Sequence, residues 1–307
     1  MSRPSSPSLD PPRAILSAVA AFAMWGVLPI YWMLLRPFGS EVVVCQRVFW
    51  TLVWLLPLLV WSQELRVVRD ALSNPHLVRT HAWTAFLLTL NWSLFIWANQ
   101  HGHIVEASLG YFLNPLLNVA IGCLLLGERL SRWRAVSIAL AAAGVVLQVV
   151  LVGKVPWIAL SLAITFALYG LFRKKSPLGS LPGLAVESAL TLPFALGTLI
   201  WLSNRGTPVV GTGSVGDWLL LFSAGACTAA PLLTFAYAAR HLRFSTLGLL
   251  QFIAPTGQFC VGAFLYHEAV SLGTLVSFVF IWIGVIVFCV ESYLRQRHAV
   301  PTAAIKE

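Results

Sequence analysis

The sequence predicts an all-helical membrane protein with ten transmembrane helices, arranged as two inverted five-helix repeats with both termini in the cytoplasm. The first reason is composition, because hydrophobic residues are 58% of the 307 residues and charged residues only 10%. A water-soluble core of this size would leave much apolar surface in water. The second reason is an internal repeat of a Pro, Gly and Glu pattern. Its two copies have identical spacing and consist of Pro115, Gly122, Glu128 and Pro255, Gly262, Glu268.

Ten apolar stretches follow one another along the chain, and each is long enough for the roughly 20 residues of a membrane-spanning helix. They cover residues 14–35, 41–61, 81–99, 104–126, 133–152, 156–173, 182–202, 218–239, 244–266 and 272–292. The stretches lack strict alternation and are about twice the length of a membrane-spanning strand. Helices are therefore expected, because a single helix satisfies its own backbone hydrogen bonds in lipid.

Further matches extend the repeat on both sides of the Pro, Gly and Glu pattern. The matched pairs are Phe95 and Phe235, Ala98 and Ala238, Leu109-Gly110 and Leu247-Gly248, and Gly144 and Gly284. A copy that begins after five crossings enters the membrane upside down, which is the architecture of carriers that expose one site alternately to each side. We expect a disordered arm at 1–12, repeats at 13–153 and 154–292, and a cytoplasmic tail at 293–307. No signal peptide is expected, because the first apolar stretch has full length.

The basic residues predict the orientation. With the N-terminus in the cytoplasm, only Arg36, Lys154 and Arg205 of the 20 Lys and Arg residues lie outside, and Arg47 lies within the second stretch. The remaining residues fall inside, as the positive-inside rule requires. The net charge of +9 is spread over the cytoplasmic connections, which suits anionic membrane lipid as a partner better than nucleic acid.

Apparent motifs for cofactor binding, metal binding or catalysis lack the structural context that such sites need. Residues 211–216 match the dinucleotide fingerprint by letter, but they lie between two apolar stretches with no βαβ unit. The five Cys lie within apolar stretches without a C-x-x-C pair, as expected for small core residues. We therefore expect no cofactor and no metal. The deep positions also offer no Ser-His, paired-Asp or metal-ligand set, so an intramembrane enzyme is disfavoured.

Two charged residues lie within apolar stretches, where an unpaired charge is costly. Arg47 is about six residues, or roughly 9 Å, from the outer end of its stretch. It either extends to the external interface or faces a cavity and binds an anionic or zwitterionic solute. Glu187 lies at a similar depth from the cytoplasmic side, so no direct salt bridge with Arg47 is expected. It either balances the basic residues 173–175 or couples transport to a proton.

Amide side chains gather on the third, fourth and ninth stretches. They are Asn91, Asn114, Asn118, Gln251 and Gln258. They either hydrogen-bond between helices or line a cavity, whereas the fifth and tenth stretches carry mainly small and branched apolar residues and are expected at the periphery. Pro115 and Pro255 each remove a backbone donor, and we interpret both as hinges.

Aromatic residues supply the remaining candidates for solute contact. They are Trp25, Trp97, Tyr111, Tyr169 and Tyr237, in which Trp25 aligns with Tyr169 and Trp97 with Tyr237. Such residues also form belts at the membrane interface. A cavity with aromatic faces and amides but few charges suits an amphipathic organic solute better than an inorganic ion.

Longer motifs resemble the RarD branch of the EamA permeases, within the drug/metabolite transporter superfamily. They are residues 91–98 (NWSLFIWA), 106–116 (EASLGYFLNPL), 126–129 (LGER), 169–175 (YGLFRKK) and 243–255 (RFSTLGLLQFIAP). The resemblance covers almost all of the chain outside the terminal arms. It implies two inverted five-helix repeats in a bacterial inner membrane, transport without ATP, and a cavity surrounded by spans one to four and six to nine. His267 stands where the family pattern has Gly before the Glu.

These observations together favour a secondary permease for a small organic solute or drug-like metabolite, working by alternating access. The expected solute contacts are Arg47, Trp25, Asn91, Trp97, Tyr111, Asn114, Tyr169, Tyr237 and Gln251. An alternative function on the same fold is a membrane sensor or partner subunit that transports nothing. A carrier and a sensor would differ in whether the accessibility of lining helices changes between the two sides.

Overall fold

The computed structural model describes residues 11–126, 131–210, 214–242, 246–247 and 250–299, and this part of the chain is helical and contains no strand. The predicted all-helical class is confirmed. The helices before residue 153 are α1 (Pro12–Leu34), the short η1 (Arg36–Phe38), α2 (Ser40–Trp61), α3 (Leu65–Ser73), α4 (Pro75–Gln100), α5 (Ile104–Leu126) and α6 (Arg132–Val152). The later ones are α7 (Trp157–Lys175), α8 (Ser180–Asn204), α9 (Val215–His241), α11 (Ile253–Cys260), the π-helix η2 (Val261–Leu265) and α12 (Leu272–Ala299).

Six helices in the described residues are long and apolar enough to cross a membrane. They are α1, α2, α6, α8, residues 215–239 of α9 and residues 272–291 of α12. Shorter apolar segments lie at Ile104–Leu117, Trp157–Arg173 and Ile253–Leu265. This composition identifies a multi-pass membrane protein.

Two boundaries differ from the prediction. The third apolar stretch was expected to begin at residue 81, but α4 begins six residues earlier, at Pro75. Asn74 starts it, because its Oδ1 accepts hydrogen bonds from the backbone N–H groups of His76 and Leu77, the usual role of an N-cap residue. The short helix α3 was not predicted, because nine residues are too few for a hydrophobic period to be evident.

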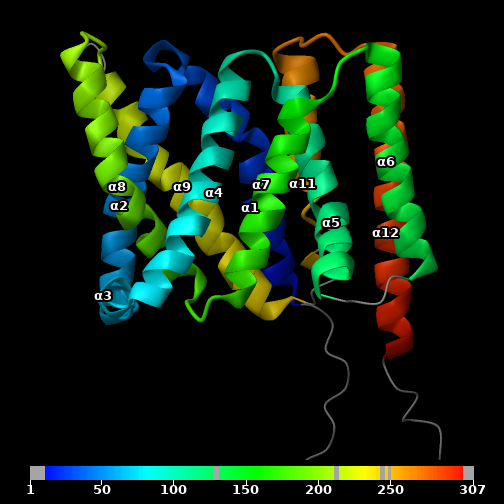
Figure 1. Ribbon diagram of the computed structural model, residues 1–307, viewed down its shortest axis with the longest axis horizontal. Helices are drawn as coiled ribbons and strands as arrows, with labels where there is room; N and C mark the ends of the chain where they lie inside the picture. The colour runs from blue at the N-terminus through cyan, green and yellow to red at the C-terminus, as the bar shows by residue number, and fades with distance from the viewer. Residues whose placement is uncertain (1–10, 127–130, 211–213, 243–245, 248–249, 300–307) are drawn as a thin grey trace, which may run out of the picture.

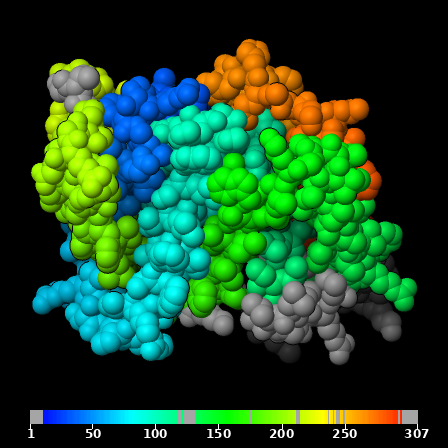
Figure 2. All heavy atoms as spheres, turned by 45° about the horizontal axis from the view of Figure 1, so that its top comes forward, coloured from blue at the N-terminus to red at the C-terminus, as the bar shows by residue number. Residues whose placement is uncertain are grey.

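The helices run side by side, and α1 begins at the same end of the bundle at which α12 finishes (Figure 1). We call this the terminal end, and the other the opposite end. The pair α6 and α12 lies at one side of the bundle, and α8 lies at the other. Figure 2 shows the surface of α8 beside that of α2 and α4, and the turn before α12 at the opposite end.

Helices α6 and α12 pack antiparallel through the two matched glycines. A methyl group on Gly144 would lie 2.7 Å from Ile281 Cγ1 and 2.9 Å from the Ser277 carbonyl oxygen. A methyl group on Gly284 would lie 2.8 Å from the carbonyl oxygen of Ser137. The repeat positions therefore make reciprocal contacts, and each needs the absence of a side chain so that the backbones can approach.

A charged pair joins the same two helices at the terminal end. Arg134 Nε donates to Glu291 Oε2 at 3.1 Å, and Ser131 Oγ donates to Glu291 Oε1 at 2.8 Å. At the other end of the pair, Gln148 Nε2 donates to Thr274 Oγ1 at 3.4 Å. These contacts fix the antiparallel register of α6 and α12.

The turn before α12 closes on the start of α5. The backbone N–H groups of Ile104 and Val105 donate to the two carboxylate oxygens of Glu268 at 2.7 and 2.8 Å. A carboxylate at a helix N-terminus satisfies free N–H groups and interacts favourably with the helix dipole. Glu268 thus connects the two halves of the chain, while its repeat counterpart Glu128 lies outside the described residues.

The residue before this carboxylate has a left-handed backbone. His267 has φ +51°, a conformation that Gly adopts freely and that other residues adopt at some cost in energy. The Gly that the resemblance led us to expect at this position would adopt the same conformation without that cost.

We expect Gly144→Ala to lower the free energy of unfolding by about 1–3 kcal/mol, because the added methyl group overpacks the α6–α12 interface. Gly170→Ala is the matched control, because a methyl group on this helical glycine meets no atom within 4 Å. It should be neutral or stabilising by up to about 1 kcal/mol. Thermal unfolding of the two purified variants in detergent measures both effects, and equal melting temperatures would contradict the close approach.

His267→Gly should raise the melting temperature. A residue with a Cβ atom pays about 1–2 kcal/mol to adopt the left-handed conformation, and Gly does not. Gly also makes the unfolded chain more flexible, which offsets part of this gain. His267→Val should lower it, since branching at Cβ disfavours positive φ further. Thermal unfolding compares the three proteins. A higher melting temperature for the Val variant would show that the turn does not hold this conformation.

Candidate functional site

Arg47 lies inside the bundle. Its side chain is 7% exposed, and its guanidinium carbon lies 3.8 Å from the ring centre of Trp92 and 4.8 Å from that of Trp32. Its Nε donates to Thr228 Oγ1 on α9 at 3.0 Å. The side chain therefore does not extend to the interface, and two aromatic faces and one hydroxyl solvate the charge.

No carboxylate of the described residues lies within 4 Å of the Arg47 guanidinium. Nearby phenols come from Tyr31, which donates to the Leu220 carbonyl oxygen at 2.5 Å, and from Tyr111. A buried cation without a counter-ion is unfavourable. This arrangement suits an anionic group that would bind between α2 and α9.

Asn91 joins three helices beside this site. Its Nδ2 donates to the Leu162 carbonyl oxygen at 3.0 Å and to Thr165 Oγ1 at 2.9 Å, both on α7. Its Oδ1 accepts from the Tyr111 hydroxyl of α5 at 3.5 Å. Asn91 is 2% exposed, so in this structure its amide serves as an interhelical connector, and Tyr111 is positioned by it.

The other amides have contacts of their own. Gln258 donates from Nε2 to the Trp25 carbonyl oxygen at 3.2 Å, and Asn114 is buried with no partner for its Oδ1 in the described chain. Gln251 lies in the turn before α11. The side chain of Asn118 is outside the described part. Asn114, Gln251 and Gln258 are not among the residues that line the two cavities described below.

The predicted aromatic residues have different surroundings. Trp25 packs against Phe22 and Phe235 near the terminal half of α1. Trp97 stacks on His101, with ring centres 4.7 Å apart. Tyr237 is 44% exposed, which places it at the outside of the bundle. Only Tyr111 and Tyr169 of the predicted set contact a charged or amide cluster in the interior.

Glu187 is the centre of a second buried cluster, which joins α4, α7 and α8. Thr84 Oγ1 donates to Glu187 Oε1 at 2.6 Å, and the Tyr169 hydroxyl donates to Oε2 at 3.2 Å. Two nitrogen groups also approach Oε1, namely His81 Nδ1 at 3.4 Å and Arg173 Nε at 3.6 Å. Glu187 is 1% exposed and His81 0%, so these two side chains are buried, whereas Arg173 is 15% exposed.

His81 and Thr84 were missed by the reading of the sequence. Both lie near the start of the predicted third stretch, and a polar side chain in an apolar stretch was the signal that identified Arg47 and Glu187. Their burial depends on α4 starting at Pro75, which places His81 two turns inside the helix instead of at its first residue.

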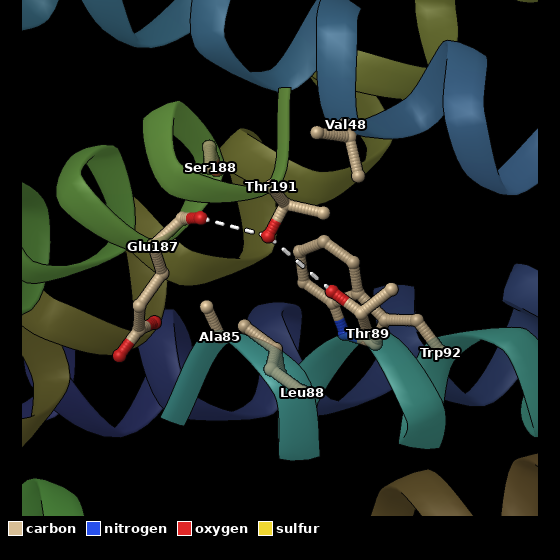
Figure 3. Close-up of a pocket in the computed structure, with 8 residues that line it drawn as sticks. All are labelled: Val48, Ala85, Leu88, Thr89, Trp92, Glu187, Ser188 and Thr191. Atoms are coloured by element: carbon tan, nitrogen blue, oxygen red, sulfur yellow. Dashed lines mark hydrogen bonds between the residues drawn. The ribbon is translucent and has the colours of Figure 1, made fainter. Parts of the chain in front are cut away.

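Two cavities adjoin this region. A cavity of about 480 Å³ lies between α2, α4 and α8, and its wall includes Glu41, Cys45, Ser93, Trp97 and Thr198. A smaller one of about 10 Å³ lies beside Glu187 and Trp92. Both are lined by Val48, Thr89 and Thr191. Figure 3 shows Thr89 and Thr191 facing each other, with their hydroxyl oxygens 3.5 Å apart.

The two proline positions differ in their backbone. Helix α5 continues through Pro115 without a break. Pro255 is in the first turn of α11, directly after a turn at Gln251 and Phe252, and the π-helix η2 follows α11. Pro115 therefore lies in a continuous helix, whereas its repeat counterpart Pro255 lies beside an interruption. π-Helical segments such as η2 often mark functional sites.

Comparison with known proteins identifies the family. Residues 12–150 match the EamA-like transporter family. "Protein RarD" of Streptomyces exfoliatus is 39% identical, with 93% of this chain and 90% of the relative covered. "Uncharacterized transporter YojE" of Bacillus subtilis is 38% identical, with 93% and 96% covered. A crystal structure with 19% identity shares the fold, at a TM-score of 0.55 over 89% of this chain and 96% of the other. The chain therefore belongs to the RarD branch of the EamA-like transporter family.

Proposed function

We propose that this protein is a secondary permease that moves a small organic solute across the bacterial inner membrane by alternating access. Residues 13–153 and 154–292 act as two inverted halves of five helices each. The antiparallel packing of α6 and α12, with reciprocal contacts at Gly144 and Gly284, supports this symmetry. Inverted halves permit one central site to open to either side in turn.

The observation that carries the proposal is the position of Arg47. Its guanidinium lies between α2 of the first half and α9 of the second, where Thr228 is its hydrogen-bond partner. A carboxylate or phosphate would pair with a guanidinium through two parallel hydrogen bonds. The rings of Trp32 and Trp92 would contact the apolar part of the solute. The solute class is therefore an amphipathic organic anion or zwitterion.

Access to Arg47 requires α2 and α9 to separate. Two further contacts hold them together, since Gly225 of α9 lies against the Trp50 carbonyl oxygen of α2, and Trp54 Nε1 donates to the Phe222 carbonyl oxygen at 3.1 Å. The structure is thus closed around the proposed site. The basic residues favour the terminal end as the cytoplasmic side.

Transport across vesicles tests the role of Arg47. Flux of an anionic metabolite, selected from a broad panel with the native protein, should fall about tenfold or more in Arg47→Gln. A charge-assisted hydrogen bond contributes about 1.5–3 kcal/mol, and tenfold corresponds to about 1.4 kcal/mol. Arg205→Gln is the matched control, since Arg205 also lies over a Trp ring, at 4.1 Å, but is exposed. It should transport normally. No flux of any solute by the native protein would refute the permease function.

Alternating access has its own test. Two positions at the site are suitable, namely Thr228 and Ser223, whose hydroxyl oxygen lies 3.1 Å from that of Tyr31. Single-cysteine variants at these positions, in a protein whose native Cys are replaced, should react with impermeant thiol reagents from one side or the other but not from both together. Conditions that raise labelling from one side should lower it from the other. A fixed pattern under all conditions would favour a membrane sensor or partner subunit over a carrier.

A further inference from the structure

We propose that His81 and Glu187 form a proton-binding site in the seam between α4 and α8, which couples solute movement to proton movement. The inference rests on the proposed transport function and adds the coupling ion to it. It depends on the buried cluster at Glu187 and on the cavities that adjoin it.

The imidazole of His81 lies between a carboxylate and a hydroxyl group. Its Nδ1 faces Glu187 Oε1 at 3.4 Å, and its Nε2 lies 2.8 Å from Ser176 Oγ. Nδ1 makes no hydrogen bond within the described residues, so the N–H of an imidazolium would have to be met by a closer approach of the Glu187 carboxylate. In the neutral ring with its proton on Nδ1, the Ser176 hydroxyl can donate to Nε2. A buried ring nitrogen that is unpaired and faces a carboxylate is a position at which an added proton gains a hydrogen bond.

The charges around the pair favour exchange over a permanent ion pair. Arg173 already approaches the carboxylate that faces His81, and its Nη2 is held by the Gly179 carbonyl oxygen at 3.0 Å. Gly183 leaves room for this guanidinium, since a methyl group there would collide with it. One carboxylate thus serves two nitrogen groups, and a proton on His81 gives the buried cluster a net positive charge.

The other elements packed on the pair bring no further ion pair to it within the described residues. Tyr169 and Arg173 of α7 and Thr84 of α4 are the groups in contact. The remaining ionisable residues on neighbouring helices include Arg13 and Tyr31 on α1, Glu41, Cys45 and Arg47 on α2, Arg66, Arg69 and Asp70 on α3, His76 and Arg79 on α4, and Glu106 and Tyr111 on α5.

The seam provides access from both ends of the bundle. Ser176 is partly exposed in the turn between α7 and α8, so a proton can reach His81 from the terminal end. On the other side of Glu187 lies the 10 Å³ cavity, which is about the size that holds one water. Thr89 and Thr191 connect it to the 480 Å³ cavity, as Figure 3 shows for the two hydroxyl groups.

The proton site and the proposed solute site share a wall. Trp92 lines the small cavity beside Glu187 and also lies under the Arg47 guanidinium. Val48, the residue after Arg47, lines both cavities. A solute that displaces Trp92 from Arg47 would therefore change the surroundings of Glu187, which is the physical contact that coupling needs.

Infrared difference spectroscopy of the purified protein in lipid tests proton binding without a solute. Changing the pH should produce an imidazole ring signal together with a carboxyl signal. Both should be lost in Glu187→Gln, and the imidazole signal should be lost in His81→Gln. His76→Gln is the matched control, because His76 is an exposed histidine on the same helix, and it should keep the signals of the cluster. Tyr169→Phe removes only a hydroxyl and should shift the carboxyl signal without abolishing it.

An unchanged difference spectrum in folded Glu187→Gln would overturn the proton site. Folding of each variant is checked by its elution as a single species. In vesicles, the flux of a transported solute should depend on pH in the native protein and His76→Gln, and lose that dependence in His81→Gln and Glu187→Gln. Flux that still depends on pH in both variants would refute the coupling. If the native protein shows no flux at all, the permease function is refuted, and the infrared spectra alone test proton binding.

Discussion

A charged or amide side chain among apolar helices has no water to bind, and this constraint organises the interior of the protein. Arg47 is solvated by two indole rings and one hydroxyl, and Glu187 gathers donors from α4 and α7. Asn91 reaches across to α7 in the same way. Because these three side chains find their partners on other helices, their positions help to determine which helices lie together.

The packing divides into a close-fitting periphery and a less regular centre. At the side of the bundle, Gly144 and Gly284 permit close backbone approach between α6 and α12, which leaves that pair little room to move. In the centre, the chain is interrupted at Gln251 and Phe252, and a π-helix follows α11. Interrupted helices are where carriers bend and bind their cargo. The centre is therefore the part in which movement between two states is expected.

The contrast between Arg47 and Glu187 is informative about function. Both are buried and occupy matched positions in the repeat, yet one is a cation without a carboxylate partner in the described chain and the other a carboxylate with two nitrogen neighbours. The two positions have thus taken different roles, as binding an anion and exchanging a proton would require. Trp92 connects the two surroundings, because it contacts the Arg47 guanidinium and lines the small cavity beside Glu187.

The sequence by itself determined the helical class, the membrane location and the family, because hydrophobic run length, the repeat and long motifs are local properties of the chain. It also identified Arg47 and Glu187, since a charge in an apolar stretch is evident without a structure. Only the tertiary structure decided their partners. Trp32, Trp92 and Thr228 are distant from Arg47 in the chain, and whether Tyr237 faces inward or outward depends on the rotation of α9. His81 was identified only from the structure, because α4 begins at Pro75 after the N-cap Asn74 and so places His81 nearly two turns inside the helix.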